Sequence, residues 1–194
     1  MTWNELTACV AERWSLEIGD PQITGWLTVL AYVVAALLSA RVWSRMAGQG
    51  GRLFWALLAV MLAALAVNKQ LDLQSALTAA GRCLAHAQGW YGERRLVQVG
   101  FIATLGAVMV AGLIAMTFSL RGNLRRNGVA LAGLVIVTGF VMMRAASFHH
   151  MDRLIGMRAL GVPNNFLFEN TGLVLIALNA GVLLMRPNAP VSRG

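Results

Sequence analysis

The chain has 194 residues, of which 58% are hydrophobic and only 12% are charged, and its mean hydropathy is +0.65. These values exclude a large water-soluble domain and indicate a polytopic membrane protein whose main partner is the lipid bilayer. The formal net charge of +8 does not indicate a nucleic-acid partner, because no segment combines basic residues with a surface for base stacking.

Residues 1–22 are predicted to form an amphipathic segment outside the membrane. Trp3, Leu6, Val10 and Trp14 recur at three- and four-residue steps, as on a helix that rests its apolar face on a membrane or on a bundle. The segment carries acidic residues in place of the basic start and apolar core of a cleavable signal peptide. We therefore expect it to remain in the mature protein.

Five apolar segments follow, each long enough, or nearly so, for a helix that crosses the bilayer, which takes about 20 residues. Helices are expected because open strands cannot satisfy their backbone groups in lipid, and the alternating pattern of a membrane barrel is absent. The second and shortest segment gains length from Asn68, Lys69 and Gln70, whose side chains can reach toward water. The prediction is an all-α domain over residues 23–186, a bundle of five transmembrane helices at 23–42, 53–67, 97–118, 129–148 and 166–185, with an outer amphipathic surface helix at 71–88 and a cytoplasmic tail at 187–194.

Five crossings place the two termini on opposite sides, and the basic residues indicate the direction. Short acid-free segments on one side carry half of the 16 basic residues, while the other side carries the remaining half together with all 8 acids. The two sides carry equal numbers of basic residues. In the acid-free segments, however, these residues are closely spaced and adjoin helix ends, as the positive-inside rule favours for the cytoplasm. We therefore expect a bacterial-type inner-membrane protein with its N-terminus outside and its C-terminus in the cytoplasm. The basic residues of the acid-free segments are Arg41, Arg45, Arg52, Arg121, Arg125, Arg126, Arg186 and Arg193.

Polar residues from three predicted helices reach the outer side at the same depth. The fourth helix ends in RAASFHHMDRL (residues 144–154), the second ends in NKQLD (68–72), and the fifth opens with NNFLFEN (164–170). Charged groups in such a position usually face the bundle interior or water and have a partner.

Two interpretations of this outer cluster remain open. In the structural one, ion pairs hold the helix ends together, Arg144 with Glu169 and Lys69 with Asp72 or Asp152. In the functional one, imidazole and carboxylate groups hold a divalent ion such as zinc. The candidate metal ligands are His149, His150, Asp152, Asp72 and Glu169.

The chain has only two cysteines, Cys9 in the N-terminal segment and Cys83 in the surface helix. Both lie on the predicted outer side, where an oxidising compartment permits disulfides. Each is close to the apolar stripe of its segment, so the two can face each other. A disulfide and two buried free thiols are both compatible with the sequence.

Asn179 is a lone amide among apolar residues of the fifth helix. It is expected to hydrogen-bond a neighbouring helix. A transport path is the alternative, but one amide among Val, Leu and Ala makes a poor channel.

Two functions from different classes follow from the sequence. The first is a non-catalytic subunit or accessory protein of a membrane complex, which binds other membrane subunits through glycine-bearing helix faces. The alternative is a metal-dependent membrane hydrolase that acts on a lipid-borne substrate at the outer leaflet, with Asp72 or Glu169 as the general base.

Overall fold

The computed structural model describes residues 2–14, 22–71, 73–89, 92, 94–145, 158–159 and 162–186. Over these residues the regular structure is helical, apart from one antiparallel pair of two-residue strands in which Ala159 pairs with Val162. The elements are α1 (Trp3–Arg13), α2 (Ile23–Arg45), α3 (Arg52–Leu71), α4 (Leu73–Ala87), α5 (Arg94–Ser119), α6 (Leu124–Ala145), β1 (Arg158–Ala159), β2 (Val162–Pro163) and α8 (Asn164–Met185).

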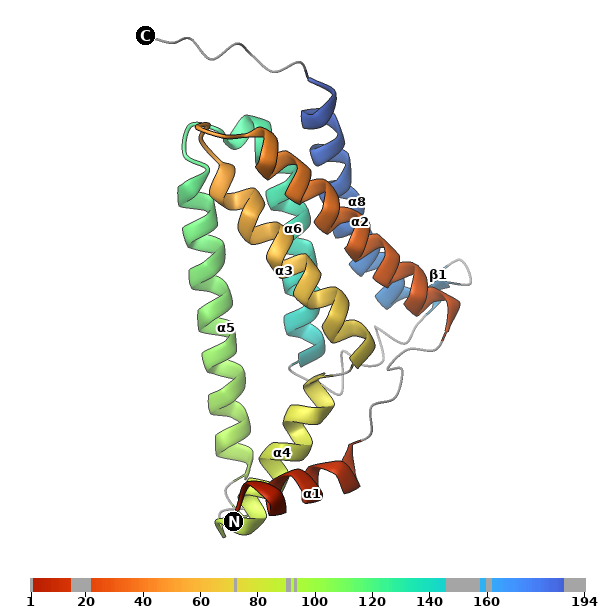
Figure 1. Cartoon of the computed structure of the whole chain (residues 1–194), viewed down its shortest axis with the longest axis vertical. Coiled ribbons are helices and arrows are strands. Elements are labelled where there is room, and N and C mark those ends of the chain that lie inside the picture. The colour runs from red at the N-terminus through yellow and green to blue at the C-terminus, as the bar shows by residue number, and fades with distance from the viewer. Residues whose placement is uncertain are drawn as a thin grey trace.

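Helices α5 and α6 run roughly along the long axis of the molecule, α2, α3 and α8 cross it obliquely, and α1 and α4 gather at one end of it (Figure 1). Four stretches are long and apolar enough to cross a membrane: Ile23–Arg45, Arg52–Leu71, Leu124–Met143 and Phe166–Met185. Helix α5 is 26 residues long and forms a shorter apolar stretch over Gly106–Ser119. The described residues therefore have the architecture of a multi-pass membrane protein.

The helices extend beyond the apolar segments that predicted them. Helix α3 continues through Lys69 to Leu71, and α6 begins at Leu124 rather than at residue 129, with Arg125 and Arg126 in its first turn. Hydrophobicity marks the part of a helix that lies in lipid, whereas backbone hydrogen bonding continues into the polar interface. The last residues of the predicted fourth segment, 146–148, lie outside the described ranges.

Helix α2 packs between α3 and α8, and α6 packs on the other side of α8. The core is formed by Tyr32 of α2, Trp55 and Leu58 of α3, Leu134 of α6 and Ile176 of α8, all of which are buried. Because lipid tails are as apolar as these side chains, close packing and hydrogen bonds hold such a bundle together more than hydrophobic burial does.

Helices α6 and α8 approach most closely at a pair of glycines. A Cβ atom added to Gly133 would lie 2.5 Å from the carbonyl oxygen of Gly172, and one added to Gly172 would lie 2.7 Å from the carbonyl oxygen of Gly133. No side chain fits there, so the two backbones meet directly. Gly139, also on α6, has no atom within 4 Å of an added Cβ.

We expect Gly133→Leu to separate α6 from α8 and to destabilise the protein by about 1–3 kcal/mol, the usual cost of overpacking, or more. The matched control is Gly139→Leu on the same helix, where an added side chain meets open space. Thermal unfolding in detergent measures both variants. Equal melting temperatures for the two variants would contradict the close contact.

Cys9 of α1 and Cys83 of α4 form a disulfide, with Cα atoms 6.2 Å apart. Of the two states that the sequence left open, a disulfide and two buried free thiols, the structure has the disulfide. Helix α1 packs against α4 and buries none of its own residues. The disulfide therefore fastens α1 to the rest of the chain.

Candidate functional site

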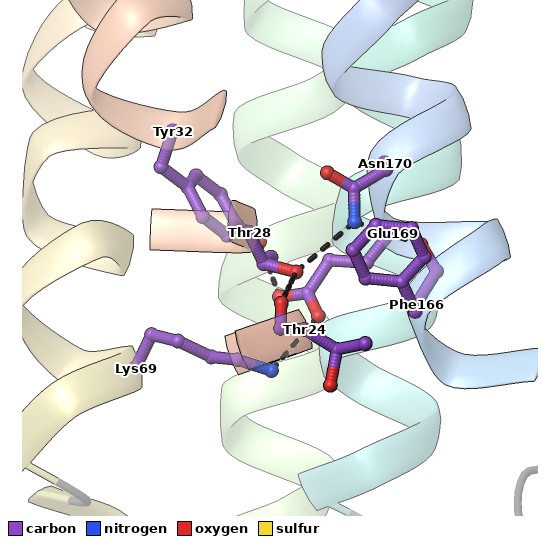
Figure 2. A network of polar contacts seen from close by, with 7 residues as sticks. All are labelled: Thr24, Thr28, Tyr32, Lys69, Phe166, Glu169 and Asn170. Carbon is purple, nitrogen blue, oxygen red and sulfur yellow. Dashed lines mark hydrogen bonds and ion pairs between the residues drawn. The ribbon is translucent and has the colours of Figure 1, made fainter. Parts of the chain in front are cut away.

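A polar cluster lies inside the bundle near the end where α1 and α4 gather, built from α2, α3 and α8 (Figure 2). Its centre is Glu169, which belongs to the second turn of α8 and is 3% exposed. The three helices are long and apolar, and the position of each polar residue along its helix sets the depth of the cluster. The polar side chains lie on the helix sides that face one another.

Both carboxylate oxygens of Glu169 have partners. The Nζ atom of Lys69 lies 3.0 Å from Oε2, and the hydroxyl of Tyr32 donates to Oε1 at 2.9 Å. The side chains of Lys69 and Glu169 are only 7% and 4% exposed. The pair is therefore a buried ion pair supported by a hydrogen bond from a third residue, Tyr32, the arrangement that offsets much of the desolvation cost of two charges.

A second row of hydrogen bonds lies beside the ion pair and joins α8 to α2. The amide nitrogen of Asn170 donates to the Thr28 hydroxyl at 3.0 Å and to the carbonyl of Phe166 at 2.8 Å. The Thr28 hydroxyl in turn donates to the carbonyl of Thr24 at 2.9 Å. These bonds fix the rotation of α8 against α2, so that Glu169 points toward Lys69 and Tyr32.

The cluster carries no net charge. Both oxygens of Glu169, its only described carboxylate, already have a donor. Residues far apart in the sequence, at positions 32, 69 and 169, meet at one carboxylate. Such a contact sets the register of three helices, because sliding or rotating any of them leaves a charge or a hydroxyl without a partner inside the membrane.

The sequence placed Lys69 and Glu169 at the same depth, and the structure joins them directly. The sequence had predicted a different partner for Lys69, either Asp72 or Asp152. Asp72 and Asp152 lie outside the described residues, and so does the side chain of Arg144, whose backbone belongs to the last turn of α6. The Arg144–Glu169 pair therefore stays a prediction.

The metal interpretation rests almost wholly on residues that the structure does not describe. His149, His150, Asp152 and Asp72 lie outside the described ranges, and only Glu169 lies within them. Within those ranges no three His, Cys, Asp or Glu residues gather as a metal site. The four outer ligands stay candidates, whereas Glu169 is already engaged by Lys69 and Tyr32.

Two members of the cluster, Thr28 and Tyr32, were missed by the sequence reading. Thr24, Thr28 and Tyr32 recur at every fourth position of a helix that is otherwise apolar, so they share one face. A polar row of this kind in a membrane helix indicates the face that turns toward the bundle.

The amide of Gln70, next to Lys69, is a further polar group at this end of α3. Its Nε2 and Oε1 atoms are buried and have no hydrogen-bond partner among the described residues.

A second polar site lies toward the opposite end and involves Asn179 of α8. Its amide accepts from the backbone N–H of Ala130 at 2.9 Å and donates to the carbonyl of Arg126 at 3.0 Å. In an α-helix the N–H of residue 130 would donate to the carbonyl of residue 126. The Asn179 amide therefore binds both members of one backbone hydrogen-bond pair of α6. The expected hydrogen bond to a neighbouring helix is present, and it gives Asn179 a structural role.

No protein-family model matches the chain, and neither a curated protein nor a solved structure matches it. A function for the chain therefore has to be argued from its own geometry and chemistry.

Proposed function

We propose that the chain is a non-catalytic subunit or accessory protein of a complex in a bacterial-type inner membrane. In this proposal α5 is a fifth crossing, so that the N-terminus lies outside and the C-terminus lies in the cytoplasm. Helices α1 and α4 then cover the outer end as amphipathic surface helices. The arginine-rich end, where α2 and α8 end, faces the cytoplasm in accordance with the positive-inside rule.

The observation that carries the proposal is the engagement of Glu169. A general base or metal ligand needs a lone pair that faces substrate or metal. Here one oxygen accepts from the Tyr32 hydroxyl and the other is paired with Lys69, in a setting that is almost completely buried. This carboxylate is suited to holding helices together, and it does not suit the hydrolase alternative in which it acts as the base.

The outward face of α5 supports an assembly role. Helix α5 touches the bundle along a narrow stripe of partly buried residues that includes Met109, Leu113 and Met116. On the opposite side, small exposed residues recur at every fourth position: Ala103, Ala107, Ala111 and Ala115. Small residues at this spacing let another helix backbone approach closely, which is how membrane helices associate.

Photo-crosslinking in native membranes tests the assembly role. A photoreactive residue at Ala107 or Ala111 is expected to crosslink to a discrete membrane protein. The matched control positions are Leu30 and Leu37, which are exposed on α2 and face lipid in this proposal. Lipid adducts alone at all four positions would contradict it.

Elemental analysis separates this proposal from the hydrolase alternative. The protein is purified in a gentle detergent, as wild type and as His150→Ala. A stoichiometric transition metal that is lost in the variant would favour the hydrolase. Glu169→Gln supplies the control, because a metal retained in that variant shows that the ion pair lies apart from the metal site.

A further inference from the structure

The end of the bundle where α2, α5 and α8 stop and α3 and α6 start is strongly basic. The described residues of this end include no acid, and all but one of their arginines are exposed. The exception is Arg126, which is partly buried. The set is Arg41, Arg45, Arg52, Arg121, Arg125, Arg126 and Arg186.

Two turns at this end are joined side by side. The α2–α3 turn and the α5–α6 turn approach so closely that a Cβ on Gly50 would lie 2.5 Å from the Nδ2 atom of Asn123. The guanidinium of Arg126 donates to the Gln49 side chain at 3.2 Å and to the carbonyl of Gly50 at 3.0 Å. The first turns of α3 and α6 therefore lie next to each other.

Three exposed arginines flank these joined turns, and two of them stack on aromatic rings. The guanidinium carbon of Arg52 lies 5.3 Å from the centre of the Trp43 ring, and that of Arg121 lies 3.9 Å from the centre of the Phe118 ring. Arg125 is the second residue of α6. Tryptophan rings at a membrane boundary lie at headgroup depth, so stacking on Trp43 holds the guanidinium of Arg52 near the level of lipid phosphates.

We call Arg52, Arg121 and Arg125 the arginine face. The direction of the neighbouring helices adds to the positive electrostatic potential of these three residues. Helices α3 and α6 present their N-terminal, partly positive ends here, which favours an anion. Helices α2, α5 and α8 end nearby with their C-terminal, partly negative ends. Arg41, Arg45 and Arg186 therefore lie where the dipoles of α2 and α8 oppose an anion, whereas Arg121 lies between the end of α5 and the start of α6, whose dipoles offset each other there. Arg45 already donates to the carbonyl of Leu184 near the end of α8, at 2.8 Å.

We propose that the arginine face binds the headgroup phosphate of an anionic phospholipid. Charge complementarity supports this occupant, since the face is cationic and no described acid offsets it. Apolar residues beside the arginine face suit the acyl chains of a lipid. The exposed residues Leu53 and Leu124 are the sequence neighbours of Arg52 and Arg125. An acyl chain fits against such residues while its phosphate meets the guanidinium groups. The proposal requires membrane insertion alone and is independent of the assembly role.

Native mass spectrometry of the full chain, released from nanodiscs of equimolar phosphatidylglycerol and phosphatidylcholine, tests the site. The wild type is expected to retain phosphatidylglycerol over phosphatidylcholine. In R52Q/R121Q/R125Q this preference is expected to fall at least about tenfold, since each interfacial arginine contributes appreciably to anionic-lipid attraction. R52K/R121K/R125K is expected to keep most of it, because the charges remain.

The matched control is R41Q/R45Q/R186Q, which removes the same charge from the same end and should keep the lipid preference. An equal loss in both glutamine variants would overturn the site in favour of a diffuse field. A wild type that retains both lipids equally would also overturn it and would leave an acidic protein as the occupant. The Cys9–Cys83 bridge and a monodisperse profile report folding, and R121Q/R125Q replaces the triple variant if that variant misfolds.

Discussion

Replacement of Lys69 by methionine is expected to lower the free energy of unfolding by about 3–5 kcal/mol, the usual cost of breaking a buried ion pair from one side. The variant leaves Glu169 almost completely buried with no cation at its Oε2 atom. Methionine keeps most of the apolar stem of lysine, so the loss reports the charge rather than a cavity. Unfolding in mixed detergent micelles, followed by circular dichroism, measures it.

A double-variant cycle shows whether the loss comes from the pair itself. Adding Glu169→Gln to Lys69→Met removes the unpaired charge, and the new amide oxygen still accepts from the Tyr32 hydroxyl. We expect the double variant to recover most of the stability, so that its loss is clearly smaller than the sum of the losses in the two single variants. Additive losses in the two single variants would mean that Lys69 and Glu169 do not interact in the membrane.

Helix positions could be read from the sequence, whereas the packing order could not. Long apolar runs identify membrane helices because only helices and closed barrels satisfy their backbone in lipid. Lipid-facing and bundle-facing sides of such helices are both apolar, so hydrophobicity does not say which side is which. In α2 the buried side carries Thr28 and Ser39, while Leu30 and Leu37 are exposed, which inverts the pattern of a soluble helix.

For the candidate site, Lys69 and Glu169 and their shared depth could be predicted, but their pairing and the contribution of Thr28 and Tyr32 could not. Helical rise places Lys69 and Glu169 at the same outer level, and the structure joins them. Which of several carboxylates a lysine meets depends on the rotation of each helix about its own axis. Successive residues of a helix point about 100° apart, so sequence position alone does not fix the partner. Thr28 and Asn170, whose hydrogen bond fixes α8 against α2, supply the missing information.

The same reasoning explains why the two ends of the bundle differ. At one end, the charges meet inside the bundle and cancel, as Lys69 and Glu169 do. At the other end, Arg52, Arg121 and Arg125 are exposed and no described acid accompanies them. A charge that is paired internally stabilises helix packing, whereas a charge that is left exposed at headgroup depth remains available to lipid.

Loss of the disulfide in Cys9→Ser is expected to release α1 while leaving the bundle folded. The bridge closes a loop with a sequence separation of 74 residues, which the chain-entropy model values at about 4 kcal/mol. The effect here should be smaller, because membrane insertion already restricts the unfolded chain. Helix α1 packs against α4, and the core lies in α2, α3, α6 and α8, so the damage should stay local.

Limited trypsin digestion of the protein in nanodiscs measures this release. Cleavage after Arg13, the last residue of α1, should become clearly faster in Cys9→Ser than in the wild type. Thr2→Ala serves as a comparison, because it removes only the capping bond that the backbone N–H of Glu5 donates to the Thr2 hydroxyl and leaves the bridge intact. Helix α1 should then fray at its start and still stay attached to α4. Equal cleavage after Arg13 in the wild type and in Cys9→Ser would show that packing against α4 holds α1 without the disulfide.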